Sequence, residues 1–219
     1  MRLILLLAVI AFAIHTNYSQ QISSPDSKLT LTIKLSKTNE LVYNLVRAGK
    51  TVIKDSKLGI DLLDQPDLLN GFKIDAVVTS NFLEEWSPVL GEVDKIVNNY
   101  NQMQVTLIQS KEKRTMIVTF RLFNDGLGFR YEFPVQDNLK YFTVLEENTQ
   151  FSLTGDHKTF WIPGDYDSQE YTYTTSLLSK VNSGTGKNVD EISVKSIPGE
   201  NFVQTPLMMK TKDGLYINI

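Results

Sequence analysis

The sequence contains no cysteine, and that absence excludes three kinds of chemistry. The chain cannot form a disulfide framework, present a thiol nucleophile or hold a metal through thiolate ligands. Histidine is also scarce, with two residues in the whole sequence. Any metal ion bound by this chain is therefore expected to be held by oxygen ligands.

Long apolar runs are missing except at the very start. Residues 3–14 form an uninterrupted apolar stretch that follows the single positive charge of Arg2. The run is short for a membrane-spanning helix and is typical of a secretory signal peptide. The alternative is a buried amino-terminal helix, which the lack of a helix cap disfavours. We expect residues 1–20 to be removed, which leaves a secreted or periplasmic protein without a membrane span.

An excess of positive charge is missing as well. The sequence has 22 basic and 25 acidic residues, which gives a formal net charge of -3. A net negative charge does not favour attraction to a phosphate backbone, so a nucleic-acid partner is not expected. The composition, 42% hydrophobic and 21% charged, is typical of a globular protein that can bury a sizeable core.

Helical periodicity is also lacking. No apolar 3.6-residue period of convincing length occurs, and residues 92–98 offer at most a turn or two of helix. Residues 29–35 instead alternate apolar and polar side chains, which is the period of a strand with one buried face. Asn124-Asp125-Gly126 gives the firmest turn, since these residue types tolerate the positive φ of a tight hairpin.

The pattern as a whole is that of an all-β protein. Short alternating runs separated by turn residues predict an antiparallel sandwich, which we place over residues 21–219 as one domain. Residues 182–201, rich in Ser, Gly, Asn and Lys, are predicted to form a mobile loop. We expect strands at residues 29–35, 41–46, 51–53, 105–109, 115–123, 129–133, 142–146, 207–210 and 215–219.

Residues 160–171 are the most unusual stretch, because aromatic rings, a Pro-Gly turn and three carboxylates lie close together. Trp161 could stack on a sugar ring while Asp165 and Asp167 bind its hydroxyl groups, and carboxylate oxygens also suit Ca²⁺. In the alternative interpretation, the two aspartates accept hydrogen bonds from backbone amides of a surface turn that the aromatic rings anchor. The spacing of residues leaves both interpretations open.

A complete catalytic set is not apparent in the sequence. There is no glycine-rich phosphate loop, no nucleophile elbow and no Ser/His/Asp combination. The adjacent pairs Glu84-Glu85 and Glu146-Glu147 cannot flank a glycosidic bond together, because neighbouring strand residues point to opposite faces. Nothing local therefore specifies a complete active site.

Three blocks, taken in order and spacing, resemble the amino-terminal domain of glycoside hydrolase family 97. This family contains α-glucosidases and α-galactosidases that many Bacteroidetes export. The second block reads FRLFNDGLGFRYEFP, and a closing segment also fits. The resemblance covers nearly the whole chain after the leader, in the segments Trp86–Asn101, Phe120–Pro134, Trp161–Tyr171 and Met208–Asn218.

The resemblance implies a galactose-mutarotase-like β-super-sandwich that packs on a catalytic (β/α)₈ barrel. It also implies that Glu170 reaches into the barrel mouth and helps to ligate a Ca²⁺ ion, and that the substrate is an α-linked oligosaccharide. The catalytic carboxylates of such enzymes belong to the barrel, before which this chain is expected to be truncated. The chain alone should then be inactive and bind Ca²⁺ weakly or not at all. The alternatives are a free-standing carbohydrate-binding module and a structural docking domain.

Overall fold

The computed structural model describes residues 19–219. The predicted signal peptide, residues 1–20, lies outside these residues except for its last two positions. The chain divides into two compact units, of which unit 1 ends at Ser152 and unit 2 comprises Leu153–Ile219. The single sandwich domain over residues 21–219 stays a prediction.

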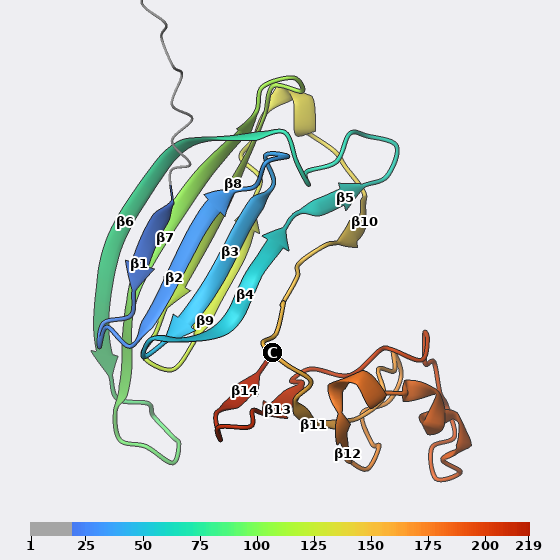
Figure 1. The fold of residues 1–219 in the computed structure, drawn as a ribbon. Helices are drawn as coiled ribbons and strands as arrows, with labels where there is room; N and C mark the ends of the chain where they lie inside the picture. Colours follow the sequence, from blue (N-terminus) through green and yellow to red (C-terminus); the bar gives the residue numbers. More distant parts are fainter. Residues whose placement is uncertain (1–18) are drawn as a thin grey trace, which may run out of the picture. The chain divides into compact units, whose positions relative to one another are not determined.

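Unit 1 is built from two four-stranded antiparallel sheets, and each sheet takes its strands in sequence order. The first sheet contains β1 (Gln20–Ser23), β2 (Leu29–Leu35), β3 (Leu41–Arg47) and β4 (Lys50–Leu58). The second contains β6 (Phe72–Trp86), β7 (Ile96–Gln109), β8 (Arg114–Leu122) and β9 (Leu127–Glu132). The two sheets lie face to face (Figure 1).

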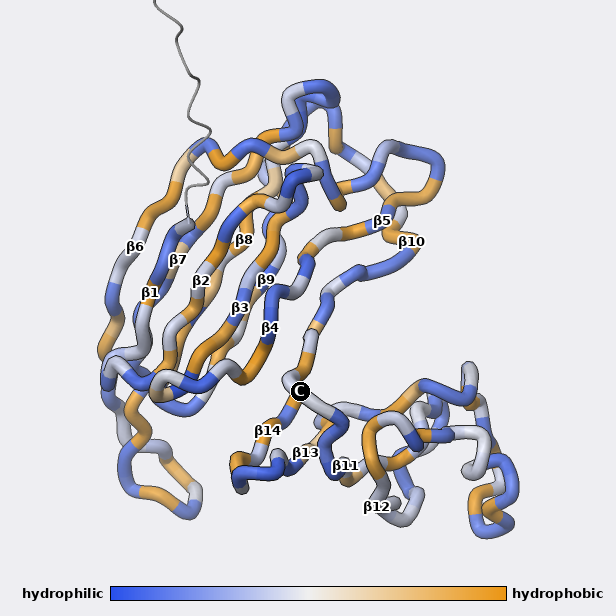
Figure 2. Tube along the Cα trace, viewed as in Figure 1, coloured by the Kyte–Doolittle hydropathy of each residue, from blue (hydrophilic) through white to orange (hydrophobic). Residues whose placement is uncertain are grey.

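The core of unit 1 lies between these two sheets. Leu29, Leu31 and Ile33, at alternate positions of β2, are buried, as its sequence pattern predicts, and the alternation of hydropathy along the strands can be followed in Figure 2. The ring of Tyr43 on β3 lies 6.1 Å from that of Phe129 on β9, so the two sheets share one apolar interior. The residues at the centre of this core include Leu31, Ile33, Tyr43, Met103, Val105, Leu107, Val118 and Phe120.

A smaller pairing completes unit 1. β5 (Ile60–Leu62) pairs with β10 (Val144–Glu147), and a short 3₁₀ helix, η1 (Asp137–Leu139), lies between β9 and β10 in the sequence.

The turns between β3 and β4 and between β8 and β9 differ in their backbone φ angles. Ala48 and Gly49 take positive φ between β3 and β4, whereas no residue from 124 to 126 does. The predicted Asn124-Asp125-Gly126 turn is present and is closed by Phe123 N, which donates to Gly126 O at 2.8 Å. The prediction that its residues take positive φ is wrong.

Unit 2 contains a four-stranded sheet in the order β12-β11-β13-β14. These strands are β11 (Lys158–Trp161), β12 (Thr174–Leu177), β13 (Met208–Lys210) and β14 (Tyr216–Asn218). Two 3₁₀ helices, η2 (Leu178–Lys180) and η3 (Ser183–Asn188), follow β12. Residues 182–201 therefore include η3, and they contribute Ser183 and Ile192 to the buried interior of the unit.

The all-β antiparallel prediction is confirmed, but the helical turn at residues 92–98 is wrong. Strand β7 begins at Ile96, and Ile96 pairs with Trp86 at the far end of β6. The pairing partner, rather than a local pattern, decides the conformation here. No helix within the described residues is both long and apolar enough to cross a membrane.

Candidate functional site

The segment singled out by the sequence starts on β11 and continues into the loop of residues 162–173. Trp161, the last residue of β11, is only 2% exposed. Its indole N–H donates to Ser176 Oγ on β12 at 3.0 Å. The ring is enclosed within unit 2. The predicted stacking of Trp161 on a sugar stays a prediction. In the same segment the ring of Tyr166 is 81% exposed.

Asp165 is 7% exposed and lies at the centre of a hydrogen-bond network. Its carboxylate accepts the Tyr171 hydroxyl at 2.5 Å, the Asp167 backbone N–H at 2.8 Å and the Ser196 backbone N–H at 3.0 Å. The Tyr171 hydroxyl, followed by the backbone donors, holds the pKa of Asp165 below its ordinary value. The geometry of an aspartate that caps backbone amides, the alternative left open by the sequence, is therefore present at Asp165.

Tyr171 provides the other half of this contact. The side chain is buried and packs with Ile162 and Ile192. Burial, together with the hydrogen bond to Asp165, raises the pKa of Tyr171 to about 12. The phenol therefore stays protonated at neutral pH and remains a donor to the carboxylate. Sequence reasoning placed Tyr171 near the candidate site but gave no signal for this pairing.

The other two carboxylates of the segment are exposed. Asp167 accepts a hydrogen bond from Ser196 Oγ, so the structure links Asp165 and Asp167 to the same segment. The Glu170 backbone N–H donates to Ser168 Oγ at 3.2 Å. Its carboxylate has no hydrogen-bond partner among residues 19–219. Glu170 is therefore the carboxylate of this loop that remains open to an external ligand.

The donor set of this loop falls short of what Ca²⁺ requires. Nowhere in the part of the chain that the structure describes do three or more His, Asp or Glu side chains gather to hold a metal. Asp165 and Asp167 are engaged internally, and Glu170 can offer at most its two oxygens of the roughly six to eight that Ca²⁺ takes. These residues fit the contribution of one ligand rather than a complete site.

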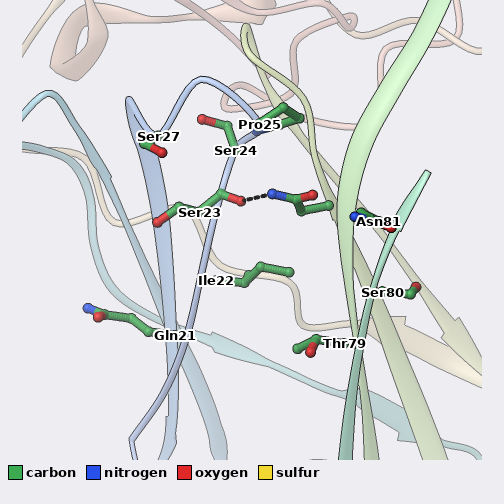
Figure 3. A pocket seen from close by; sticks show the side chains of 10 residues that line it. Gln21, Ile22, Ser23, Ser24, Pro25, Ser27, Thr79, Ser80 and Asn81 are labelled. Carbon is green, nitrogen blue, oxygen red and sulfur yellow. Dashed lines mark hydrogen bonds between the residues drawn. The ribbon is translucent and has the colours of Figure 1, made fainter. Parts of the chain in front are cut away.

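A second candidate is a polar groove of about 620 Å³ in unit 1, shown in Figure 3. It lies between β1 with its following loop and the middle of β6, and Asn101 Nδ2 donates to Ser23 O at 2.8 Å beside it. The lining is mostly hydroxyl and amide side chains, with neither an aromatic ring nor a charge. The residues are Gln21, Ile22, Ser23, Ser24, Pro25, Ser27, Thr79, Ser80, Asn81 and Asn101. Without an aromatic platform, this groove offers little to hold a pyranose ring.

Comparison with known proteins gives a consistent result. A family model described as glycosyl-hydrolase 97 N-terminal matches residues 22–219. A retaining alpha-galactosidase of Bacteroides thetaiotaomicron is 25% identical over 191 residues, which is 82% of this chain and 27% of that protein. The chain therefore spans about a quarter of the length of this relative.

Solved structures show the same relation. A glycoside hydrolase family 97 enzyme from Pseudoalteromonas sp. strain K8, in complex with panose, has a TM-score of 0.77 and 27% identity. The match covers 91% of this chain and 28% of that chain. The enzyme in complex with acarbose gives a TM-score of 0.77 at 26% identity, over the same shares of the two chains. A beta-arabinopyranosidase, at 19% identity and a TM-score of 0.74, covers 91% of this chain and 31% of its own; it shares the fold.

Proposed function

We propose a function from one premise: this chain belongs to the glycosyl-hydrolase 97 N-terminal family. In this proposal the chain is the non-catalytic domain of an exported, calcium-dependent α-glycoside hydrolase. It packs on a catalytic barrel and lends Glu170 to the calcium site at the mouth of that barrel. The general acid and the second catalytic carboxylate belong to the barrel, so the chain alone performs no hydrolysis.

The observation that carries the proposal is the state of Glu170. Its carboxylate is exposed and uncommitted, while the neighbouring Asp165 and Asp167 are both engaged in hydrogen bonds. An exposed carboxylate on a loop whose other acids are satisfied is suited to complete a site formed with another part of a protein. Bound Ca²⁺ would supply a fixed positive charge that orients sugar hydroxyl groups.

The substrate class is inferred from the relatives. One is a retaining alpha-galactosidase, and another was solved with panose and with acarbose. These names support an α-linked oligosaccharide as the ligand of the assembled enzyme. In this proposal the exposed Tyr166 and Asp167 contact such a sugar, and Asp167 does so while it also accepts the hydrogen bond from Ser196 Oγ.

The test uses Glu170→Gln in the protein that joins this domain to its barrel, with Glu191→Gln, an exposed glutamate of the same unit, as the matched control. Hydrolysis of p-nitrophenyl α-glycosides is measured after chelation and titration with Ca²⁺. Glu170→Gln is expected to raise the Ca²⁺ concentration for half-maximal activity by about tenfold or more. An unchanged Ca²⁺ titration in Glu170→Gln would remove the proposed role of this residue.

The isolated chain allows a second, simpler test of the proposed function. It should show no turnover of p-nitrophenyl α-glucoside or α-galactoside, and calorimetry should detect weak Ca²⁺ binding or none. A micromolar Ca²⁺ affinity that disappears in Glu170→Gln would mean that the loop forms a complete site by itself, against the proposal.

A free-standing carbohydrate-binding module is the second candidate, favoured by the exposed rings of Tyr166 and Tyr173. Calorimetric titration of the isolated chain with maltooligosaccharides separates the two functions. Affinity tighter than roughly millimolar that is lost in Tyr166→Ala would favour the module, because the ring would then act as a stacking platform. Trp161→Ala is not a clean probe, since removal of a buried tryptophan costs about 3–5 kcal/mol of folding free energy.

A further inference from the structure

The loop that carries Glu170 is long but anchored at both ends. Residues 162–173 connect β11 to β12, and the flanking residues Trp161 and Thr174 pair with each other. No strand or helix forms between them. Each ordered residue of such a loop loses roughly 1–2 kcal/mol of backbone entropy. A fixed position for Glu170 therefore requires specific contacts within the loop.

Asp165 supplies these contacts across the loop and beyond it. The bond to the Tyr171 hydroxyl joins the first half of the loop to the second half. The bond from Ser196 N, together with Tyr166 N donating to Ser196 O at 3.2 Å, ties the loop to a separate segment. Gln204 Nε2 also donates to the Asp165 carbonyl at 2.7 Å.

Tyr171 cannot easily leave this arrangement. Its ring is enclosed by Ile162 and Ile192, and Gly186 lies directly against it. A Cβ atom at Gly186 would lie 3.0 Å from Tyr171 Cε1 and 2.7 Å from Pro163 Cγ. The close packing fixes the ring, and the hydroxyl at its end holds the Asp165 carboxylate.

Glu170 is the immediate neighbour of Tyr171, and Ser168 Oγ accepts its backbone N–H. The backbone of Glu170 is thus held on both sides while its carboxylate remains free. We infer that Asp165 is a positioning residue: with Tyr171 and Ser196 it forms a buried clamp that sets the direction from which Glu170 meets its ligand. This inference rests on the proposed role of Glu170.

The clamp also explains why Asp165 is poorly suited to contact a sugar directly. Its two oxygens already accept the Tyr171 hydroxyl and two backbone N–H groups, and its side chain is almost fully buried. If this carboxylate turned to bind a ligand hydroxyl, its buried donors would be left without an acceptor. The free-energy cost of those unpaired donors would exceed the gain from the new hydrogen bond. The substrate contact predicted for Asp165 stays a prediction, and in this inference Asp165 acts through Glu170.

The test compares Tyr171→Phe, which removes one hydroxyl and keeps the ring, with the matched variant Tyr173→Phe at an exposed position. Amide hydrogen exchange of residues 165–172 and of Ser196 is measured in the isolated chain. Tyr171→Phe should accelerate exchange in these segments by about tenfold or more, because a hydrogen bond to a charged group is lost. Tyr173→Phe should leave it unchanged. Asp165→Asn, which keeps one acceptor oxygen, gives a second measurement if Tyr171→Phe does not fold.

A second readout separates positioning from a general loss of structure. In the protein joined to its barrel, Tyr171→Phe should raise the Ca²⁺ concentration for half-maximal activity several-fold, while saturating Ca²⁺ restores the rate. The shift should be smaller than the one in Glu170→Gln, which loses the proposed ligand itself. A Tyr171→Phe protein whose exchange rates and Ca²⁺ titration both match those of Tyr173→Phe would overturn the clamp. Faster exchange in Tyr171→Phe, combined with an unchanged Ca²⁺ titration in Glu170→Gln, would support the clamp and contradict the proposed function.

Discussion

Arg114 and Asp67 are charged residues of unit 1 whose pKa values are shifted in the folded state. Arg114 is buried, and its Nη2 donates to Asp67 O at 2.9 Å and to Gln109 Oε1 at 2.7 Å. Its Nε has no partner within residues 19–219. Burial lowers the pKa of the guanidinium. Beside it, a hydrogen bond shared with the Asp61 carboxyl group is the main cause that raises the pKa of Asp67.

The raised pKa of Asp67 makes the stability of the fold depend on pH in a defined direction. Because the pKa of Asp67 is raised in the folded state, its contribution is fully present below the ordinary value of 3.8 and is lost as pH rises through the folded pKa. An asparagine at position 67 does not ionise, so Asp67→Asn avoids this pH-dependent loss of stability. The free energy of unfolding of the variant should therefore increase relative to that of the natural chain as pH rises from about 3 to 7. Urea unfolding across this range measures the difference. Asp64→Asn, in the same connection, is the control, and a difference for Asp67→Asn that did not vary with pH would contradict the argument.

The residues of the candidate site were only partly predictable. The sequence identified the segment, because an unusual mixture of aromatic rings and carboxylates is visible locally, and the family resemblance pointed to Glu170 within it. It could not reveal that Asp165 is buried, since its partners Ser196 and Gln204 lie 31 and 39 residues away. Nor could it show that Trp161 faces the interior. Which side of a short strand is buried depends on what packs against it.

At the scale of elements, β6 is the feature that most needed the structure. Its 15 residues form the edge of the second sheet, and nearly all of them beyond Phe72 are partly or fully exposed. A strand without a buried face has no alternation to detect, whereas β2 was predicted over its observed bounds because one face is buried. Pairing with β7 defines β6, and pairing is a tertiary property.

The exposed edge of β6 predicts self-association of the isolated chain. Val78 is 59% exposed in the part of the strand between Asp75 and Glu84, where no charged residue protects the edge. Val78→Lys should lower the light scattering of concentrated samples, because a charge on an edge strand opposes pairing with another copy. Val135→Lys, at an exposed site between elements, should have little effect. Equal effects of the two substitutions would argue for general solubility rather than edge pairing.

At the scale of the whole molecule, the two units differ in the size of their cores. Unit 1 has two facing sheets with many fully buried side chains, while unit 2, with residues 153–219, buries fewer. A small unit buries a smaller fraction of its surface and is correspondingly less stable. Membership of both units in one family domain therefore does not require that they unfold together.

The two tryptophans allow this to be measured. Trp86→Phe leaves Trp161, buried in unit 2, as the sole tryptophan of the chain. We expect its fluorescence to report unfolding at a lower urea concentration than far-UV circular dichroism, which follows the larger sheets of unit 1. The control is that the dichroism curve of Trp86→Phe matches that of the natural chain, since Trp86 is exposed. Coincident transitions by both probes would show one cooperative unit.

The order of strands in unit 1 has a kinetic consequence. In both four-stranded sheets each strand pairs with its neighbour in sequence, so each pairing joins segments that follow one another along the chain. The exception is β5 with β10, which are separated by all four strands of the second sheet. Such a topology keeps the conformational search local, which favours rapid folding for a β protein. The closing of β10 onto β5 must wait until the second sheet has brought the two segments together.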